Sequence, residues 1–321
     1  MTDRHATTPY VRPDVAQFLQ FLNNLPGPRT HEVEPPVARA TFVAMKDLAD
    51  PPLGALAVVR DLAIPGPAGT IPARLYDARA ERSAGPVMMF FHGGGFVIGN
   101  IETHGSLCAE MARLLDLPVV SVDYRLAPEA PWPAAPDDCE AASRWVAGSP
   151  PELGFAVTGL VTCGDSAGGA LTIITTMALR DAPAAVPVIA QFPIYPVVDV
   201  SSRYQSYHDF GEGFLLTQQS MTWFDAHYRP DMSHWRGAAL SGAHHCLPPT
   251  LVITAGLDPL RDQGRAYAGA LIAQGVPTIY REAIGNIHGF VTLRKAIPSA
   301  QEELVGALTV LKVMIAEATG R

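Results

Sequence analysis

The sequence predicts an α/β protein with a mostly parallel central sheet that is covered by helices on both faces. Three observations favour this fold class. Apolar strand-like runs alternate with helix-like runs from about residue 86 onwards. The strand-like runs are almost continuously apolar, as strands buried on both faces are. Glycine-rich turns follow several of these runs, where strand-to-helix connections are expected.

The composition agrees with one large folded domain. The chain has 321 residues, of which 48% are hydrophobic and 17% charged, so it can bury a sizeable core. Its formal net charge of −8 offers no basic face to a nucleic acid. The longest apolar stretch, 186–198, is cut by three prolines and is too short to span a bilayer, and no signal peptide is visible. We therefore expect no nucleic-acid partner, no membrane span and a cytoplasmic location.

The cysteine pattern points the same way. Cys108, Cys139, Cys163 and Cys246 are scattered, without a C-x-x-C pair. In a chain of this size that spacing is typical of reduced thiols rather than of a disulfide framework. The A-H-H-C stretch at 243–246 has no further ligands at metal spacing, so we interpret it as a surface loop and expect no metal.

The elements at the start of the chain differ from those that follow. Val15, Phe18, Leu19 and Leu22 recur at helical spacing before a Pro-Gly-Pro stop, and a second helical stretch ends near residue 50. After residue 57, two strands joined by Gly/Pro turns predict a hairpin.

The rest of the chain alternates between strands and helices. The strand-like runs are 86–91, 118–124, 158–163, 187–196, 250–256 and 278–283. Helical runs stand between most of them, among them 104–116 and 167–180. Between about 200 and 232 the alternation stops, which predicts an insertion over the sheet edge.

The segment G-D-S-A-G at 164–168 has the pattern of a serine nucleophile at a sharp turn. A strand-like run precedes it and a helix-like run follows, so the flanking positions have no room for side chains. The alternative is that Ser166 only caps the helix. The strand–turn–helix context favours the nucleophile.

A second signal is the run of glycines in F-F-H-G-G-G-F at 90–96, directly after a buried strand. Residues without side chains expose backbone N–H groups, which can bind a developing oxyanion. The N–H of Ala167, the residue after the serine, is the expected partner donor. A flexible loop and a phosphate loop are the alternatives, but no lysine follows at phosphate-loop spacing.

An acid and a base are expected after the serine in the chain. Asp258 follows an apolar strand directly, and His288 lies in a glycine-flanked loop after the next strand. Both positions are at carboxyl ends of strands, so the three side chains can meet at one edge of the sheet. Asp165, Asp199 and Asp262 compete for the role of the acid, and position favours Asp258.

The motifs H-G-G-G-F, Y-R-L-A-P-E, G-D-S-A-G-G, D-P-L-R-D and H-G-F together resemble the bacterial hormone-sensitive-lipase-like (family IV) carboxylesterases, a branch of the α/β-hydrolase superfamily. The resemblance covers roughly residues 70–295. It implies an eight-stranded sheet and a helical cap, built from an N-terminal segment (1–50) and the insertion at about 200–232, on a catalytic domain of residues 51–321. It also implies a cofactor-free carboxylesterase that acts on short- to medium-chain esters.

The resemblance assigns roles to individual residues. Ser166, Asp258 and His288 match the catalytic triad, and Gly93, Gly94 and Ala167 match the oxyanion donors. Glu129 and Asp165 match structural support of the site. The family's pattern is broken at Ala238–Ala239, Gln263 and Asn286, so the substrate preference is not carried over.

Six apolar residues are candidates for lining the substrate pocket under the cap, with simple cap–core packing as the alternative: Phe18, Leu22, Phe214, Leu215, Trp223 and Phe224. An amidase or peptidase could use the same triad, because the catalytic set is common to both. A non-catalytic receptor on this fold would be expected to lose the serine or the histidine, and both are present. We expect a small-molecule ester as partner, and a homodimer with an exposed last strand as its seam.

Overall fold

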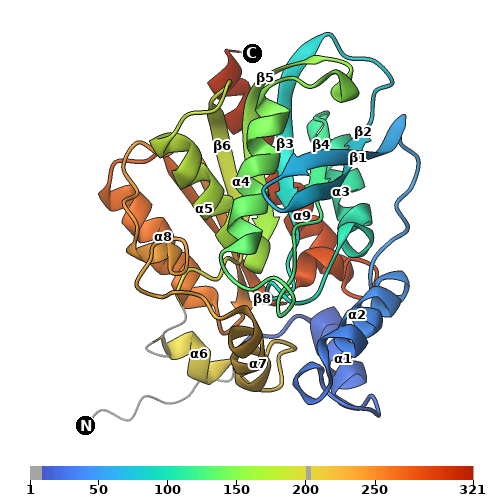
Figure 1. Cartoon of the computed structure of the whole chain (residues 1–321). Coiled ribbons are helices and arrows are strands. Elements are labelled where there is room, and N and C mark those ends of the chain that lie inside the picture. Colours follow the sequence, from blue (N-terminus) through green and yellow to red (C-terminus); the bar gives the residue numbers. More distant parts are fainter. Residues whose placement is uncertain (1–8, 200–203, 321) are drawn as a thin grey trace.

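An eight-stranded sheet crosses the protein in the computed structural model, which describes residues 9–199 and 204–320 (Figure 1). The strands stand in the order β1-β2-β4-β3-β5-β6-β7-β8. Their bounds are β1 Val58–Gly66, β2 Gly69–Asp77, β3 Ala84–Phe91, β4 Val119–Val122, β5 Ala156–Asp165, β6 Val188–Ile194, β7 Thr250–Leu257 and β8 Thr278–Ile287. The pairs β1–β2 and β2–β4 are antiparallel and all other pairs are parallel, so the predicted fold class is confirmed.

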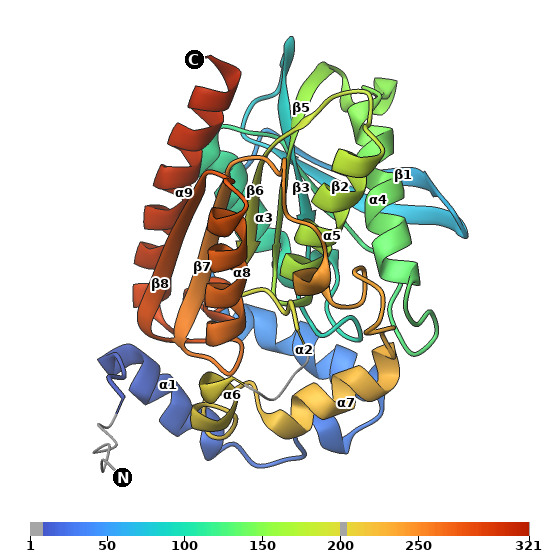
Figure 2. The same cartoon turned by 90° about the vertical axis from the view of Figure 1, so that its left-hand side faces the viewer.

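Helices cover both faces of the sheet. On one face, α3 (Ile101–Leu115) packs beside α9 (Pro298–Thr319). The other face carries α4 (Ala134–Ala147), α5 (Ala167–Asp181) and α8 (Arg261–Ala273), and Figure 2 shows the sheet between the two layers. Within residues 9–199 and 204–320, four short 3₁₀ helices complete the connections: Thr30–Glu32, Pro151–Leu153, Ala239–Ser241 and Phe290–Thr292.

The sheet divides the interior into two apolar cores. Along β3, Met89 and Phe91 contribute to the core under α4, α5 and α8, whereas Met88 and Phe90 contribute to the core under α3 and α9. All four side chains are fully buried. This two-sided burial explains why the strands are continuously apolar rather than alternating.

Four further helices gather at one end of the sheet, at the bottom of Figure 1. They are α1 (Pro13–Asn23), α2 (Pro35–Ala49), α6 (Gln205–Asp209) and α7 (Gln218–Tyr228). The first two begin with proline, which is pre-organised for the first helical turn. Of the insertion expected at about 200–232, residues 200–203 lie outside the described residues, and the remainder holds α6 and α7.

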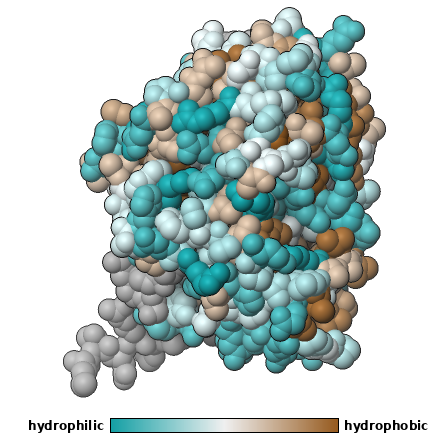
Figure 3. Space-filling view, viewed as in Figure 1, coloured by the Kyte–Doolittle hydropathy of each residue, from teal (hydrophilic) through white to brown (hydrophobic). Residues whose placement is uncertain are grey.

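The surface is mixed in character. On the face in Figure 3, hydrophobic residues form small patches among hydrophilic ones. Within the described ranges, no helix combines the length and the apolar character that crossing a membrane requires.

Candidate active site

Ser166 lies at the turn between β5 and α5, in a strained backbone conformation. Its φ of 55° and ψ of −116° are sparsely populated by residues that carry a side chain. Such a conformation persists because its surroundings hold it: the Ser166 N–H donates to the carbonyl of Ile194 on β6, at 2.9 Å. The turn projects the serine out of the end of the sheet, as the sequence pattern predicts.

The glycines on either side of the serine allow this turn. A Cβ on Gly164 would lie 2.4 Å from the carbonyl oxygen of Gly168. A Cβ on Gly168 would lie 1.8 Å from the carbonyl oxygen of Phe91, at the end of β3. Real Cβ atoms do not approach backbone so closely, so both positions require glycine.

Three predicted side chains meet beside this turn. The His288 Nδ1 atom lies 2.7 Å from Asp258 Oδ2, and its Nε2 atom lies 2.9 Å from Ser166 Oγ. An ionised Asp258 can only accept, so Nδ1 carries the proton and Nε2 is free to accept from the serine hydroxyl. Asp258 is fully buried, and its Oδ1 accepts from the Leu260 N–H at 2.8 Å, which fixes the carboxylate.

The competing carboxylates are engaged elsewhere. Asp262 accepts from the Ser206 N–H at 3.0 Å and pairs with Arg261 and Arg265, so it ties α8 to α6. Asp165 lies behind the serine, on the side of α3. Asp258 is therefore the carboxylate that holds His288.

The glycine loop (residues 92–99) connects β3 to α3 and contains the expected oxyanion donors. Here the expectation for Gly93 is wrong, because its N–H donates to Asp165 Oδ1 at 2.8 Å and is not available to a substrate. The N–H groups of Gly94, Gly95 and Ala167 find no acceptor among the described residues. Gly95, which the sequence reasoning did not select, thus replaces Gly93 as a candidate donor.

Asp165 is the centre of a buried polar group that supports the loop. Besides the Gly93 N–H, its Oδ1 lies 3.2 Å from His104 Nε2. The Thr103 hydroxyl donates to the Asn100 carbonyl and so accepts from His104 Nδ1, at 2.8 Å. His104 thus links Asp165 to the first turn of α3. Burial raises the pKa of Asp165, but the charge and hydrogen bonds of His104 outweigh it and the pKa is lowered.

Glu129, expected to support the site, is held by a residue that sequence reasoning missed. Its side chain is 60% exposed and pairs with Arg39 of α2 at 2.6 Å. The Arg39 side chain lowers the pKa of Glu129 through hydrogen bonds. Nothing in the sequence distinguishes Arg39 from other arginines of surface helices.

Two of the six candidate pocket residues lie next to the site. The Phe224 ring occupies the space of a Cβ on Gly95, at 2.3 Å, and the Leu215 side chain comes within 3.7 Å of the corresponding position on Gly289, beside His288. The other four belong to the two cores or pack against them: Phe18, Leu22, Phe214 and Trp223.

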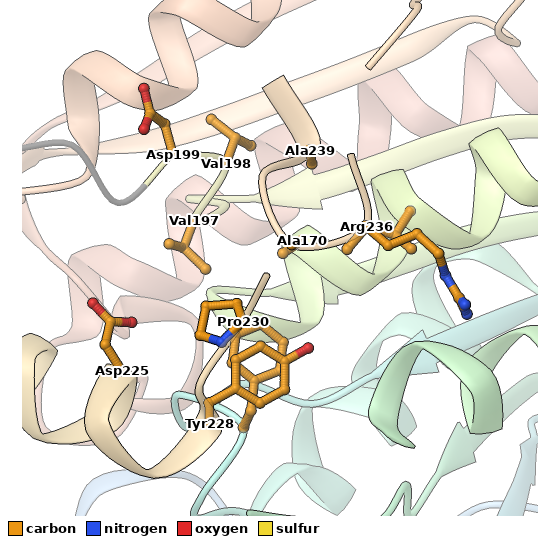
Figure 4. A pocket seen from close by; sticks show the side chains of 12 residues that line it. Ala170, Val197, Val198, Asp199, Asp225, Tyr228, Pro230, Arg236 and Ala239 are labelled. Atoms are coloured by element: carbon orange, nitrogen blue, oxygen red, sulfur yellow. The ribbon is translucent and has the colours of Figure 1, made fainter. Parts of the chain in front are cut away.

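A cavity of about 30 Å³ opens next to α5, one turn beyond the serine (Figure 4). Ala170, Val197, Tyr228 and Pro230 are among its lining residues, and none of the six candidate pocket residues is. Its volume is enough for about one water molecule. Among the residues that the structure describes, no group of three metal-ligating side chains gathers.

Comparison with known proteins agrees with this geometry. A family model described as the α/β hydrolase fold matches residues 88–292. The chain belongs to the α/β-hydrolase family. The segment that matches includes the glycine loop, Ser166, Asp258 and His288.

Several relatives of this hydrolase are named as esterases or ester hydrolases. It is 39% identical to the carboxylic ester hydrolase LipN of Mycobacterium tuberculosis, over 78% of this chain and 69% of that protein. It is 33% identical to an ethyl acetate hydrolase of Pseudomonas putida, over 94% and 98% of the two chains. The solved structure of the ester hydrolase EH1AB1 from the Lake Arreo metagenome matches with a TM-score of 0.88 at 36% identity, over 94% and 98%. The prediction of a carboxylic ester hydrolase is confirmed, in agreement with the resemblance to the hormone-sensitive-lipase-like carboxylesterases.

Proposed function

We propose that this esterase hydrolyses short- to medium-chain carboxylic esters through a Ser166–His288–Asp258 triad and an acyl-enzyme intermediate. The observation that carries the proposal is the unbroken pair of hydrogen bonds from Asp258 through His288 to Ser166, at 2.7 and 2.9 Å. This arrangement is the one in which a histidine can take the serine proton while a carboxylate orients it.

In the first half of the reaction, Ser166 Oγ attacks the ester carbonyl and His288 Nε2 takes its proton. The buried Asp258 stabilises the imidazolium that forms. The negative charge that develops on the carbonyl oxygen is stabilised by the N–H groups of Gly94, Gly95 and Ala167. Such donors act most strongly when they are already in place and have no other partner.

In the second half, His288 returns the proton to the leaving alcohol, which departs and leaves the acyl group on Ser166. A water molecule then gives a proton to His288 and attacks the acyl carbon. Collapse of that intermediate releases the carboxylic acid and restores the serine hydroxyl. The cycle consumes one water and needs no redox partner.

We propose that α1, α2, α6 and α7 form a cap over the catalytic domain (residues 51–321). Phe224 against Gly95 of the glycine loop and Leu215 against Gly289, next to His288, support this role, because both side chains reach the site from the insertion. The acyl pocket is proposed to lie between these two side chains.

The test is hydrolysis of p-nitrophenyl acetate, butyrate, octanoate and palmitate by the native protein and by Ser166→Ala. We expect turnover that is highest on the shorter chains and about a million-fold lower in the variant, because the nucleophile is lost. Both proteins are first compared by circular dichroism and thermal unfolding. Equal turnover by the folded variant would exclude the triad, and a maximum at palmitate would exclude the chain-length preference.

A further inference from the structure

The backbone of the glycine loop is strained and is stabilised by few hydrogen bonds of its own. Gly94, Gly95, Phe96 and Gly99 all have positive φ, between 59° and 117°, and Phe96 does so with a large side chain. A residue that carries a Cβ is strained in this left-handed region. Within the loop, only the Val97 and Ile98 N–H groups bond back, both to the Gly94 carbonyl. Contacts from other elements must therefore fix the loop.

One such contact comes from α2. The Arg39 Nε–H donates to the Val97 carbonyl at 2.8 Å, and its Nη2 donates to the Ala127 carbonyl at 2.8 Å. The same guanidinium holds the Glu129 carboxylate through both Nη atoms, at 2.9 and 2.6 Å. The Ala127 N–H in turn donates to the Phe96 carbonyl at 2.9 Å. Arg39 thus joins the glycine loop to the segment that precedes α4.

The second contact comes from α7, on which Phe224 and Tyr228 lie one turn apart. The Phe224 ring rests on Gly95, and the Tyr228 ring stacks on Phe96 with centroids 3.8 Å apart and planes 6° apart. These apolar contacts pack against the loop but do not fix the orientation of a particular peptide group. The hydrogen bond from Arg39 does fix an orientation, because it binds the Val97 carbonyl.

We infer that Arg39 is a positioning residue of this esterase, which orients the Gly94 and Gly95 N–H groups by holding the Val97 carbonyl in place. The Ile98 N–H, which shares a peptide with the Val97 carbonyl, donates to the Gly94 carbonyl at 2.9 Å. The Gly94 carbonyl shares its peptide with the Gly95 N–H, so a rotation of the Val97 peptide would turn the Gly95 N–H and, through the next peptide, the Gly94 N–H. The inference rests on the proposed function. It adds a group outside the triad, on the N-terminal segment, on which the oxyanion geometry depends.

The first test is Arg39→Met, which keeps an unbranched stem but removes every hydrogen bond. We expect kcat for p-nitrophenyl butyrate to fall about 10- to 100-fold, because misplaced N–H donors stabilise the oxyanion of the transition state less well. KM should change by less than about threefold. Arg39→Lys retains the charge but cannot reach both carbonyls and Glu129 with one ammonium, so its kcat should be intermediate.

The second measurement separates positioning from structural support. A trifluoromethyl ketone forms a tetrahedral adduct with the serine and places an oxyanion at the donors, whereas the matching methyl ketone binds without one. In Arg39→Met, affinity for the trifluoromethyl ketone should fall by the same factor as kcat. Affinity for the methyl ketone should stay within about threefold.

A second arginine provides the control. Arg60 on β1 also donates to backbone carbonyls, those of Glu152 and Leu153, and touches no part of the site. Arg60→Met should lower the melting temperature about as much as Arg39→Met while leaving kcat within about twofold.

The inference is overturned if Arg39→Met keeps kcat within twofold of the native enzyme, or if affinities for both ketones fall equally. The same holds if Arg60→Met loses as much kcat. The proposed function is tested separately: turnover by the native protein that is lost in Ser166→Ala supports it, whatever the Arg39 variants show. Should Ser166→Ala remain active, the proposed function fails and the role of Arg39 fails with it.

Discussion

At the scale of single residues, the site depends on which hydrogen-bonding groups are already taken. Asp258 uses one oxygen on the Leu260 N–H and presents the other to His288. Asp165, 72 residues after Gly93 in the chain, accepts from the Gly93 N–H, and the N–H groups of Gly94 and Gly95 stay available. Which groups can act on a substrate therefore depends on which hydrogen-bonding atoms already have a partner in the protein, as well as on residue type.

Asp258→Asn tests the proposed orientation of His288. The Leu260 N–H should keep the amide oxygen, so the amide NH₂ would face the imidazole and favour the tautomer that cannot accept the serine proton. We expect kcat to fall about 10⁴-fold with the fold intact. Steady-state kinetics on p-nitrophenyl butyrate measure this, and Asp262→Asn, four residues on, is the matched control. More than a tenth of the native kcat in Asp258→Asn would contradict the assignment.

The candidate catalytic side chains could be predicted from the sequence because each follows an apolar strand in an expected order. The choice among the glycines could not. Gly93 and Gly95 are equivalent in a run of three glycines, and only the meeting of the β3 and β5 loops places Asp165 against Gly93. Arg39 was missed for the same reason, since its partners are backbone carbonyls distant in the chain.

At the scale of elements, a buried ion pair connects the end of α2 to the segment between β8 and α9. Arg294, between β8 and α9, forms a two-pronged pair with Asp50 at the end of α2, at 2.9 and 2.8 Å, and donates to Ser106 on α3 at 2.7 Å. The Arg294 and Asp50 side chains are 2% and 3% exposed. The pair lies where three parts of the chain meet.

Asp50→Ala should lower the free energy of unfolding by about 3–5 kcal/mol, because it leaves the buried Arg294 without its charge partner. Urea unfolding followed by circular dichroism measures the change. Asp181→Ala, which removes the partner of Arg180 at a carboxylate that is 56% exposed, should cost less than about 1 kcal/mol. Equal losses in the two variants would contradict the importance of burial.

Element ends were predicted less well than element types, for local reasons. Helix α3 begins at Ile101, three residues before the expected start, because Asn100 caps it by accepting from the Thr103 N–H at 3.0 Å. Strand β8 continues to Ile287, beyond the expected end at 283. Periodicity reports the middle of an element, whereas caps and neighbouring strands decide its ends.

At the scale of the whole molecule, stability should depend on pH through two neighbouring groups that act in opposite directions. Burial, together with the charge of His104, lowers the pKa of His92 to about 3, so the folded protein holds His92 neutral. Burial raises the pKa of Asp123 to about 6. The His92 Nε2 and Asp123 Oδ1 atoms lie 3.9 Å apart.

The signs follow from proton binding. Between pH 4 and 6 the unfolded chain binds a proton on His92 that the folded one does not, so His92 makes stability fall as pH falls, by up to ~1.4 kcal/mol per pH unit. Asp123 binds a proton in the folded state that the unfolded state lacks, so it makes stability fall as pH rises. Relative to the native protein, Asp123→Asn should therefore gain stability from pH 4 to pH 6, and His92→Phe should lose it. Urea unfolding across this range measures both, and parallel pH profiles for the three proteins would refute the assignment.

The edge position of β8 bears on assembly. Among the described residues, no further strand pairs with the outer edge of β8, and Arg12 of the N-terminal segment donates to the Ile284 and Gly285 carbonyls of this strand. Ile279 and Ile284 on β8 are 40% and 59% exposed. A homodimer through this edge stays a prediction.

The order in which the strands contribute to the site has a consequence during biosynthesis. The glycine loop and the proposed triad residues Ser166, Asp258 and His288 follow β3, β5, β7 and β8 in that order. His288 lies 122 residues after Ser166 in the chain, so a nascent chain that has emerged only as far as Ser166 holds the proposed nucleophile without its base. We therefore expect hydrolytic activity to appear only after residue 288 has left the ribosome.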